Sequence, residues 1–256
     1  MALMFFALPA AGQDWARAAL EKSPRHAEWV QLKHGDRTVS AFVVYPEVKN
    51  KAAAVVVIHE ISGLTDWARS VADQLAAHGY IAIAPDLLSG MGPKGGRTSD
   101  FPNVDAVVEA VSKLDPDQVT GDLNAAADYV KTLPAANGKL AVAGFCWGGG
   151  QSFRFATNRK DLSAAFVFYG VPPKDVNSIS APVYGFYAGN DERIDAMIPD
   201  AQEAMKKAGK KYDVVTYEGA GHGFMRAGED PANTVEANTR ARGQAWERWL
   251  GVLKTL

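Results

Sequence analysis

The sequence has 256 residues but only one cysteine, Cys146, and this scarcity excludes several kinds of site. A lone cysteine forms neither an intramolecular disulfide nor a Cys-x-x-Cys metal or redox motif. None of the five histidines has a second histidine at a convincing zinc-binding spacing. We therefore expect no metal and no organic cofactor. The thiol itself is either a small packed hydrophobe, as free cysteines commonly are, or a reactive group.

The chain also lacks an excess of either charge. Its 27 basic and 29 acidic residues give a net charge of -2 and are mixed along the sequence. Such a surface creates no long-range field that would gather nucleic acid or an anionic membrane. We expect a monomer that acts on a small molecule and binds neither nucleic acid nor membrane.

Long hydrophobic runs are missing as well. The apolar stretch Met1–Gly12 is too short to span a bilayer. It is similar to the core and cleavage site of a secretory signal, although no Lys or Arg precedes it. Two interpretations remain open: a clipped signal peptide of an exported protein, or an apolar segment packed on a cytoplasmic one. We divide the chain into an N-terminal segment with a helix, residues 1–24, and one domain, residues 25–256.

What is present from about residue 38 onward is an alternation of β-branched apolar runs and amphipathic stretches, which is typical of βαβ units. It predicts an α/β domain with a mostly parallel central sheet and helices on both faces. The predicted strands are Thr38–Tyr45, Ala53–Ile58, Tyr80–Ala84, Lys139–Ala143, Ser163–Phe168, Pro182–Tyr187 and Tyr212–Tyr217. The predicted helices are Thr65–His78, Pro116–Leu133, Gly149–Asn158, Ala196–Ala208 and one from about Ala232 to Lys254.

The glycine-rich segment Ser89–Gly96 lacks the spacing of a phosphate-binding loop. We interpret it as a flexible loop at the carboxyl edge of the sheet, where ligands bind in open α/β folds.

The strongest chemical signal is the segment G-F-C-W-G-G, residues 144–149, between a predicted strand and a predicted helix. It has the form glycine-x-nucleophile-x-glycine, in which a tight turn exposes the nucleophile at the sheet edge. The partial positive charge of the helix N-terminus favours the thiolate. These features favour Cys146 as a nucleophile over a buried inert thiol.

A carboxylate and a histidine are expected after later strands, in that order. Asp191 follows the strand Pro182–Tyr187 in a G-N-D turn, and Glu192 and Asp195 are its rivals. His222 lies in the glycine-rich loop after the strand Tyr212–Tyr217, where it can act as general base and acid.

The loop after the strand Ala53–Ile58 is the expected source of a second oxyanion-hole amide. We assign the two amides to Ile61 and Trp147. Glu60 stands at the same strand end and is either a surface carboxylate or a group that takes the thiol proton or holds a substrate cation.

Taken together, five motifs resemble the dienelactone hydrolase family of the α/β-hydrolase fold, from about Val39 to the C-terminus. They are H-E-I-S-G (59–63), A-P-D-L (84–87), G-F-C-W-G-G (144–149), G-N-D (189–191) and G-A-G-H-G-F (219–224). The resemblance implies a triad of Cys146, Asp191 and His222. It also implies that Glu60 contacts the thiol and helps to form the thiolate when substrate binds.

Family members that open dienelactones hold the substrate carboxylate with two arginines. Arg226, four residues beyond the histidine, matches one of them, and a plain surface salt bridge is its alternative role. The second arginine has no counterpart, since Leu88–Met91 stands in its place. Tyr169 matches a tyrosine that lines the family's site, although core packing also accounts for it.

The sequence therefore predicts a hydrolase that cleaves an ester or lactone through a cysteine nucleophile and a thioester acyl-enzyme. Two alternatives remain. One is a general carboxylesterase for small aryl or alkyl esters, which the missing arginine permits. The other is a redox-sensing or ligand-binding protein on the same fold, against which the absence of a second, resolving cysteine counts.

Overall fold

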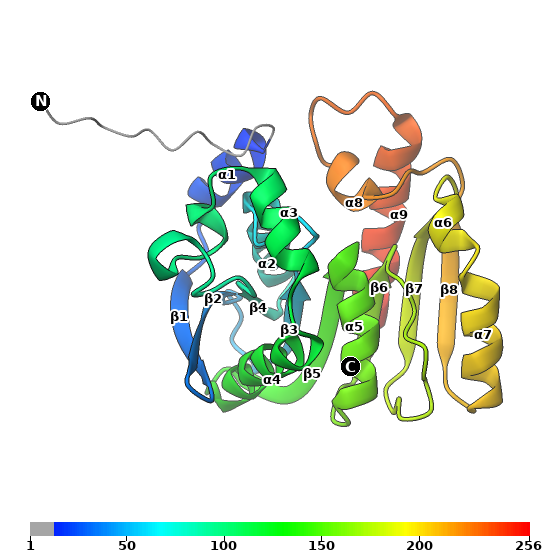
Figure 1. Cartoon of the computed structure of the whole chain (residues 1–256), viewed down its shortest axis with the longest axis horizontal. Coiled ribbons are helices and arrows are strands. Elements are labelled where there is room, and N and C mark those ends of the chain that lie inside the picture. Colours follow the sequence, from blue (N-terminus) through cyan, green and yellow to red (C-terminus); the bar gives the residue numbers. More distant parts are fainter. Residues whose placement is uncertain (1–12) are drawn as a thin grey trace, which may run out of the picture.

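One sheet organises residues 13–256, the part of the chain that the computed structural model describes (Figure 1). Its strand order is β1-β2-β4-β3-β5-β6-β7-β8. The pairs β1/β2 and β2/β4 are antiparallel, and every other neighbouring pair is parallel. The strands are β1 (Ala27–His34), β2 (Arg37–Val44), β3 (Ala52–Ile58), β4 (Ile81–Pro85), β5 (Ala136–Phe145), β6 (Ala164–Phe168), β7 (Val183–Ala188) and β8 (Tyr212–Tyr217).

Helices cover both faces of this sheet. Side chains of α3, α4, α5 and α7 pack into the core on one face, and those of α1, α2, α8 and α9 pack on the other. The α-helices are α1 (Asp14–Glu21), α2 (Asp66–Ala77), α3 (Val104–Ser112), α4 (Pro116–Thr132), α5 (Trp147–Asn158), α6 (Glu192–Asp195), α7 (Ile198–Lys207), α8 (Phe224–Ala227) and α9 (Glu236–Leu253). This arrangement is the α/β-hydrolase architecture predicted from the sequence.

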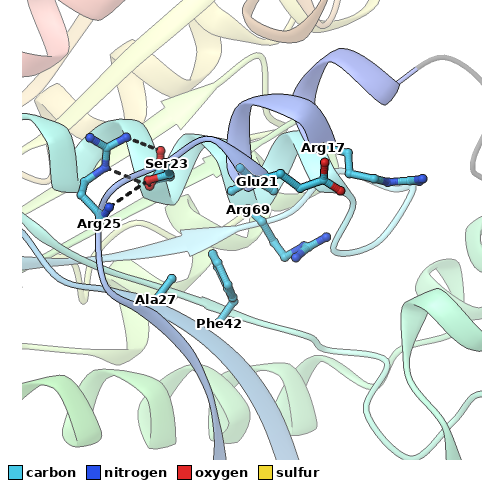
Figure 2. A pocket seen from close by; sticks show the side chains of 9 residues that line it. Arg17, Glu21, Ser23, Arg25, Ala27, Phe42 and Arg69 are labelled. Carbon is cyan, nitrogen blue, oxygen red and sulfur yellow. Dashed lines mark hydrogen bonds and ion pairs between the residues drawn. The ribbon is translucent and has the colours of Figure 1, made fainter.

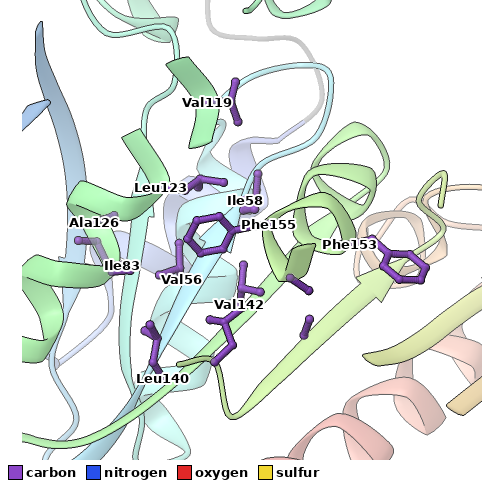
Figure 3. Close-up of a cluster of buried hydrophobic side chains, with 14 of the residues drawn as sticks. Val56, Ile58, Ile83, Val119, Leu123, Ala126, Leu140, Val142, Phe153 and Phe155 are labelled. Atoms are coloured by element: carbon purple, nitrogen blue, oxygen red, sulfur yellow. The ribbon is translucent and has the colours of Figure 1, made fainter. Parts of the chain in front are cut away.

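Two separate apolar cores follow from the alternation of side chains along the strands. On β3, Val56 and Ile58 face the core beneath α4 and α5, whereas Val55 and Val57 face the core beneath α2 and α9. Figure 3 shows the first core, in which Phe155 of α5 meets the β3 and β5 side chains. Because both faces are buried, β3 is a continuous apolar run, as buried parallel strands usually are.

All seven predicted strands and five predicted helices are present, with ends shifted by up to about four residues. The sequence prediction missed β1, α3 and the short helices α6 and α8. β1 escaped because it is an edge strand of mixed polarity, with only Leu32 fully buried. The segment Ser89–Gly96 lies after β4 as expected, and it holds the short 3₁₀ turn Pro93–Gly95.

The N-terminal helix α1 is tied to α2 by ion pairs. Arg25, just after α1, forms an ion pair with Asp73, and the Ser23 hydroxyl donates to the same carboxylate at 2.5 Å (Figure 2). Arg17 donates to Asp66 at 3.1 Å. The predicted signal segment Met1–Gly12 lies outside the described residues. Within residues 13–256 no helix combines the length and the apolar character needed to cross a bilayer.

Candidate active site

Five parallel strands end at one edge of the sheet, and a residue singled out from the sequence lies directly or a few positions after each strand end. Cys146 follows β5, Tyr169 follows β6, and Asp191 comes shortly after β7. The loops after β3 and β8 carry Glu60 and His222. Because parallel strands point the same way, residues as far apart in the sequence as Glu60 and His222 come to this edge.

The turn that carries Cys146 is strained. Its backbone adopts φ 55° and ψ -117°, which a residue with a side chain rarely does. The turn closes only because its neighbours are glycines: a Cβ on Gly144 would lie 1.9 Å from the Gly148 carbonyl oxygen. Such strain is typical of a nucleophile that a turn presents at the start of a helix. The thiol is half-buried and the helix α5 begins at the next residue.

Asp191 and His222 form a direct pair. The His222 Nδ1 donates to the Asp191 Oδ2 at 2.5 Å, and the Asp191 side chain is almost fully buried. The Asn190 amide donates to the Ala220 carbonyl oxygen, which joins the two loops. Of the rival carboxylates, Glu192 is exposed, and burial together with the Asp191 charge raises the pKa of Asp195. Asp191 is the carboxylate that contacts the imidazole.

The imidazole of His222 also lies beside the thiol. The neighbouring Cys146 thiol is the largest cause that raises the pKa of His222 to about 9, and the contact with Asp191 adds to it. Burial acts in the opposite direction. The three predicted triad residues therefore lie together, with the imidazole between the thiol and the carboxylate, and they favour a charged imidazole at neutral pH.

The two amides assigned to the oxyanion hole belong to residues that line the same cavity as Cys146 and His222. Within the described part of the chain, neither the Ile61 nor the Trp147 backbone N–H donates to another protein group. Unpaired amides beside a nucleophile are what an oxyanion hole requires.

Glu60 and Arg226 contact each other. The Arg226 Nε donates to the Glu60 Oε2 at 2.8 Å, and the Glu60 side chain is nearly buried. The negative charge of Glu60 is the largest cause that raises the pKa of Arg226. Contact between Glu60 and the thiol, which the resemblance implied, remains a prediction. Arg226 itself does not line the cavity that holds Cys146.

Tyr169 both packs in the core and lines this cavity. Its ring lies edge-on to the His222 ring with centroids 5.0 Å apart, and its backbone has φ 41°. The hydroxyl has no partner within the described residues, and burial holds its pKa well above the usual value. The Tyr169 ring therefore packs against the imidazole, and its hydroxyl stays protonated.

The cavity has a volume of about 630 Å³, which suits a small organic substrate. Its apolar lining includes Val171, Pro172, Pro173 and Ile194. Its charged side chains, apart from the catalytic candidates, are all cationic: Arg154, Lys174 and Arg193. Sequence reasoning missed these three, because Arg154 comes from α5, Lys174 from the loop after β6 and Arg193 from α6, and only the fold brings the three segments together.

Comparisons with known proteins place the chain in a family. The family model of the dienelactone hydrolase family matches residues 39–256. A protein of Methylorubrum extorquens named "Putative carboxymethylenebutenolidase" is 33% identical over 240 residues, which cover 87% of this chain and 81% of that protein.

Two solved structures have the same fold. A crystal structure of a "Putative Dienelactone Hydrolase" from Klebsiella pneumoniae superposes with a TM-score of 0.79 at 24% identity, covering 91% of this chain and 99% of that one. The dienelactone hydrolase of Anabaena variabilis superposes with a TM-score of 0.64 at 21% identity, covering 86% and 96%. The two structures show a shared fold. The family match over residues 39–256 and the identity to the Methylorubrum protein show that this chain belongs to the dienelactone hydrolase family of α/β hydrolases.

Proposed function

We propose that this hydrolase cleaves an ester or lactone with Cys146 as its nucleophile. The observation that carries the proposal is the position of the His222 imidazole, between the Cys146 thiol and the Asp191 carboxylate. A histidine held in this way takes the proton of the thiol and keeps it as an imidazolium ion, while the carboxylate fixes its tautomer.

The reaction then follows in two halves. The Cys146 sulfur attacks the carbonyl carbon, and the Ile61 and Trp147 amides bind the oxygen as it gains negative charge. His222 gives its proton to the leaving alcohol, which departs and leaves a thioester on the sulfur. A water that loses its proton to His222 attacks the thioester, and the acid and the free thiol are released. A thiolate leaves a tetrahedral intermediate more readily than an amine does, so esters and lactones suit this site better than amides.

The charges of the cavity favour a substrate that carries an acidic group. Lys174 and Arg193 are exposed and form no ion pair within the described residues. The Arg154 guanidinium donates to three oxygens of α4: the Asp117 carboxylate, the Pro116 carbonyl oxygen and the Thr120 hydroxyl. Arg226, the residue that matches the family's carboxylate-binding arginine, is held by Glu60 and lies outside the cavity wall. Lys174 and Arg193 are thus the cations best placed to bind a substrate carboxylate.

A general esterase for neutral aryl or alkyl esters is the second candidate. The apolar lining around Ile194 favours this second candidate, since such a surface binds an uncharged acyl or aryl group as readily as an acidic one. The two candidates share every step of the chemistry and differ only in what the cations contribute to binding.

A hydrolysis assay tests the proposal. Purified wild type and Cys146→Ala are compared on a short aryl ester and on an enol lactone that carries a carboxylate, with iodoacetamide block of the wild type as a second control. We expect turnover by the wild type, none above background by Cys146→Ala or the blocked enzyme, and a higher kcat/KM for the acidic lactone. Hydrolysis that survives in Cys146→Ala would contradict the assignment of the nucleophile.

A further inference from the structure

A second histidine of the active-site edge, His59, has no role in the chemistry described above. It directly follows β3 and is completely buried. Burial lowers its pKa, so the ring is neutral and carries one proton. Its Nδ1 lies 2.7 Å from the carbonyl oxygen of Glu60. Because a carbonyl oxygen only accepts, that proton is on Nδ1 and the ring donates to the carbonyl.

The bonded carbonyl belongs to the peptide unit whose N–H is the Ile61 amide. In a planar trans peptide the C=O and the N–H point in opposite directions. A hydrogen bond that holds the Glu60 carbonyl on one side therefore fixes the direction of the Ile61 N–H on the other. The Gly63 amide donates to the same oxygen at 3.0 Å. Two donors on one carbonyl also polarise the peptide and make its N–H a stronger donor.

The same ring lies against the residue that carries the other oxyanion amide. The rings of His59 and Trp147 stack with centroids 5.5 Å apart and an angle of 15° between their planes. The backbones touch as well, since a Cβ on Gly148 would lie 2.3 Å from the His59 carbonyl oxygen. His59 therefore contacts both segments that supply the oxyanion hole.

The other ring nitrogen supports a functional role. The Nε2 of His59 is buried and has no hydrogen-bond partner within the described residues. A phenyl ring would fill the same space without a buried nitrogen. Packing alone therefore does not account for the ring nitrogens, one of which donates to the Glu60 carbonyl.

We propose that His59 is a positioning residue of the oxyanion hole, which orients and polarises the Glu60–Ile61 peptide through Nδ1 and holds Trp147 by stacking. The proposal rests on the proposed function, because it assumes that an oxyanion forms on a Cys146 adduct. It adds a residue that aims the amides without touching the substrate.

Three variants test it: His59→Phe keeps the ring and its stacking but loses the donor, and His59→Asn loses the ring but places an amide N–H where Nδ1 was. His78→Phe, at the end of α2, is the control for exchanging a histidine elsewhere. For His59→Phe we expect kcat to fall about 10- to 100-fold with KM changed less than about twofold, since loss of a whole oxyanion donor costs more. Its thermal midpoint should equal or exceed that of the wild type. His59→Asn restores the donor but not the stacking, so its kcat should lie between those of His59→Phe and the wild type, and His78→Phe should match the wild type.

Two further readouts separate orientation of the amides from damage to the nucleophile. Alkylation of Cys146 by iodoacetamide forms no oxyanion, so its rate should be unchanged in His59→Phe. A trifluoromethyl ketone forms a hemithioketal whose oxyanion occupies the hole, so its affinity should fall in parallel with kcat.

The possible failures differ from one another. Wild-type kcat in His59→Phe, or an equal loss in His59→Asn and His59→Phe, would overturn the role of His59 and leave the hydrolase intact. If His59→Phe does not fold, His59→Asn still decides. A folded His59→Asn whose kcat falls about 10²- to 10³-fold, as on loss of a whole oxyanion-hole donor, would refute the proposal. Hydrolysis by Cys146→Ala would instead refute the proposed function itself.

Discussion

The two histidines of the active-site edge have different neighbours and opposite pKa shifts. His222 lies between a thiol and a carboxylate, and these neighbours raise its pKa to about 9. His59 is completely buried next to a backbone carbonyl and an indole ring, and burial lowers its pKa. In our proposals the same side chain moves protons at position 222 and serves as a fixed neutral donor at position 59. The difference comes from the neighbours and not from the residue type.

The largest effect is expected from replacing His222 or the carboxylate that binds it. His222→Ala removes the group that takes the thiol proton and protonates the leaving alcohol, so kcat/KM should fall about 10³- to 10⁴-fold. Asp191→Asn should have an effect of similar size, because the amide no longer holds the charged imidazole. Steady-state kinetics on the aryl ester measure both, with Asp195→Asn as the matched control. A similar loss in Asp195→Asn would show that the carboxylate is misassigned.

Glu60 contacts both His59 and Arg226, since its carboxylate binds Arg226 and its carbonyl oxygen accepts from His59. If the carboxylate helps to form the thiolate, Glu60→Gln should lower kcat about 100-fold, at the lower end of the effect typical of general acid–base catalysis. Arg226→Gln should lower it less, because it frees Glu60 and leaves the carboxylate in place. Kinetics of both variants decide the matter: wild-type kcat in Glu60→Gln would reduce the carboxylate to a salt-bridge partner of Arg226.

A further effect concerns the cations of the cavity. Replacing Lys174 and Arg193 with Gln should raise KM for the acidic lactone about 10-fold and leave KM for the neutral aryl ester unchanged. The difference between the two substrates should shrink in the wild type at high salt, since these cations are exposed. Equal changes for both substrates would favour the general esterase.

The smallest effect is the one that measures the two histidines directly. NMR titration should show His222 titrating near pH 9 and His59 remaining neutral at neutral pH. In Cys146→Ala the pKa of His222 should decrease, because the thiol is the largest cause of its increase. A raised folded-state pKa means that protonation of His222 stabilises the fold below about pH 6.5, and that this contribution disappears as the pH rises through about 9. His222→Ala should therefore lose stability less steeply than the wild type between these values.

The sequence was informative where chemistry depends on short local patterns. The G-F-C-W-G-G turn, the G-N-D turn and the glycine-flanked histidine each follow a strand, and parallel strands bring such residues to one edge. The order of the three motifs was therefore enough to predict that Cys146, Asp191 and His222 lie together. The two faces of the sheet were predictable for the same reason, since buried strands such as β3 are apolar throughout.

What the sequence did not predict depends on where side chains point after the chain has folded. His59 begins the motif H-E-I-S-G, in which the sequence assigned roles only to Glu60 and Ile61. Its hydrogen bond to the Glu60 carbonyl depends on a side-chain rotamer. The contact of Lys174 and Arg193 with one cavity depends on loops, and the engagement of Arg226 by Glu60 spans 166 positions. No local pattern encodes contacts of these kinds.

The central claim is that the acyl group passes through Cys146, and trapping that intermediate tests it most directly. Wild type is mixed with an activated aryl ester, quenched in acid within the first turnover, and digested for peptide mass spectrometry. We predict the mass of the acyl group on the peptide that contains Cys146, its removal by hydroxylamine, and no such adduct in Cys146→Ala. An acyl group on any other residue, or turnover by Cys146→Ala at the wild-type rate, would contradict the account.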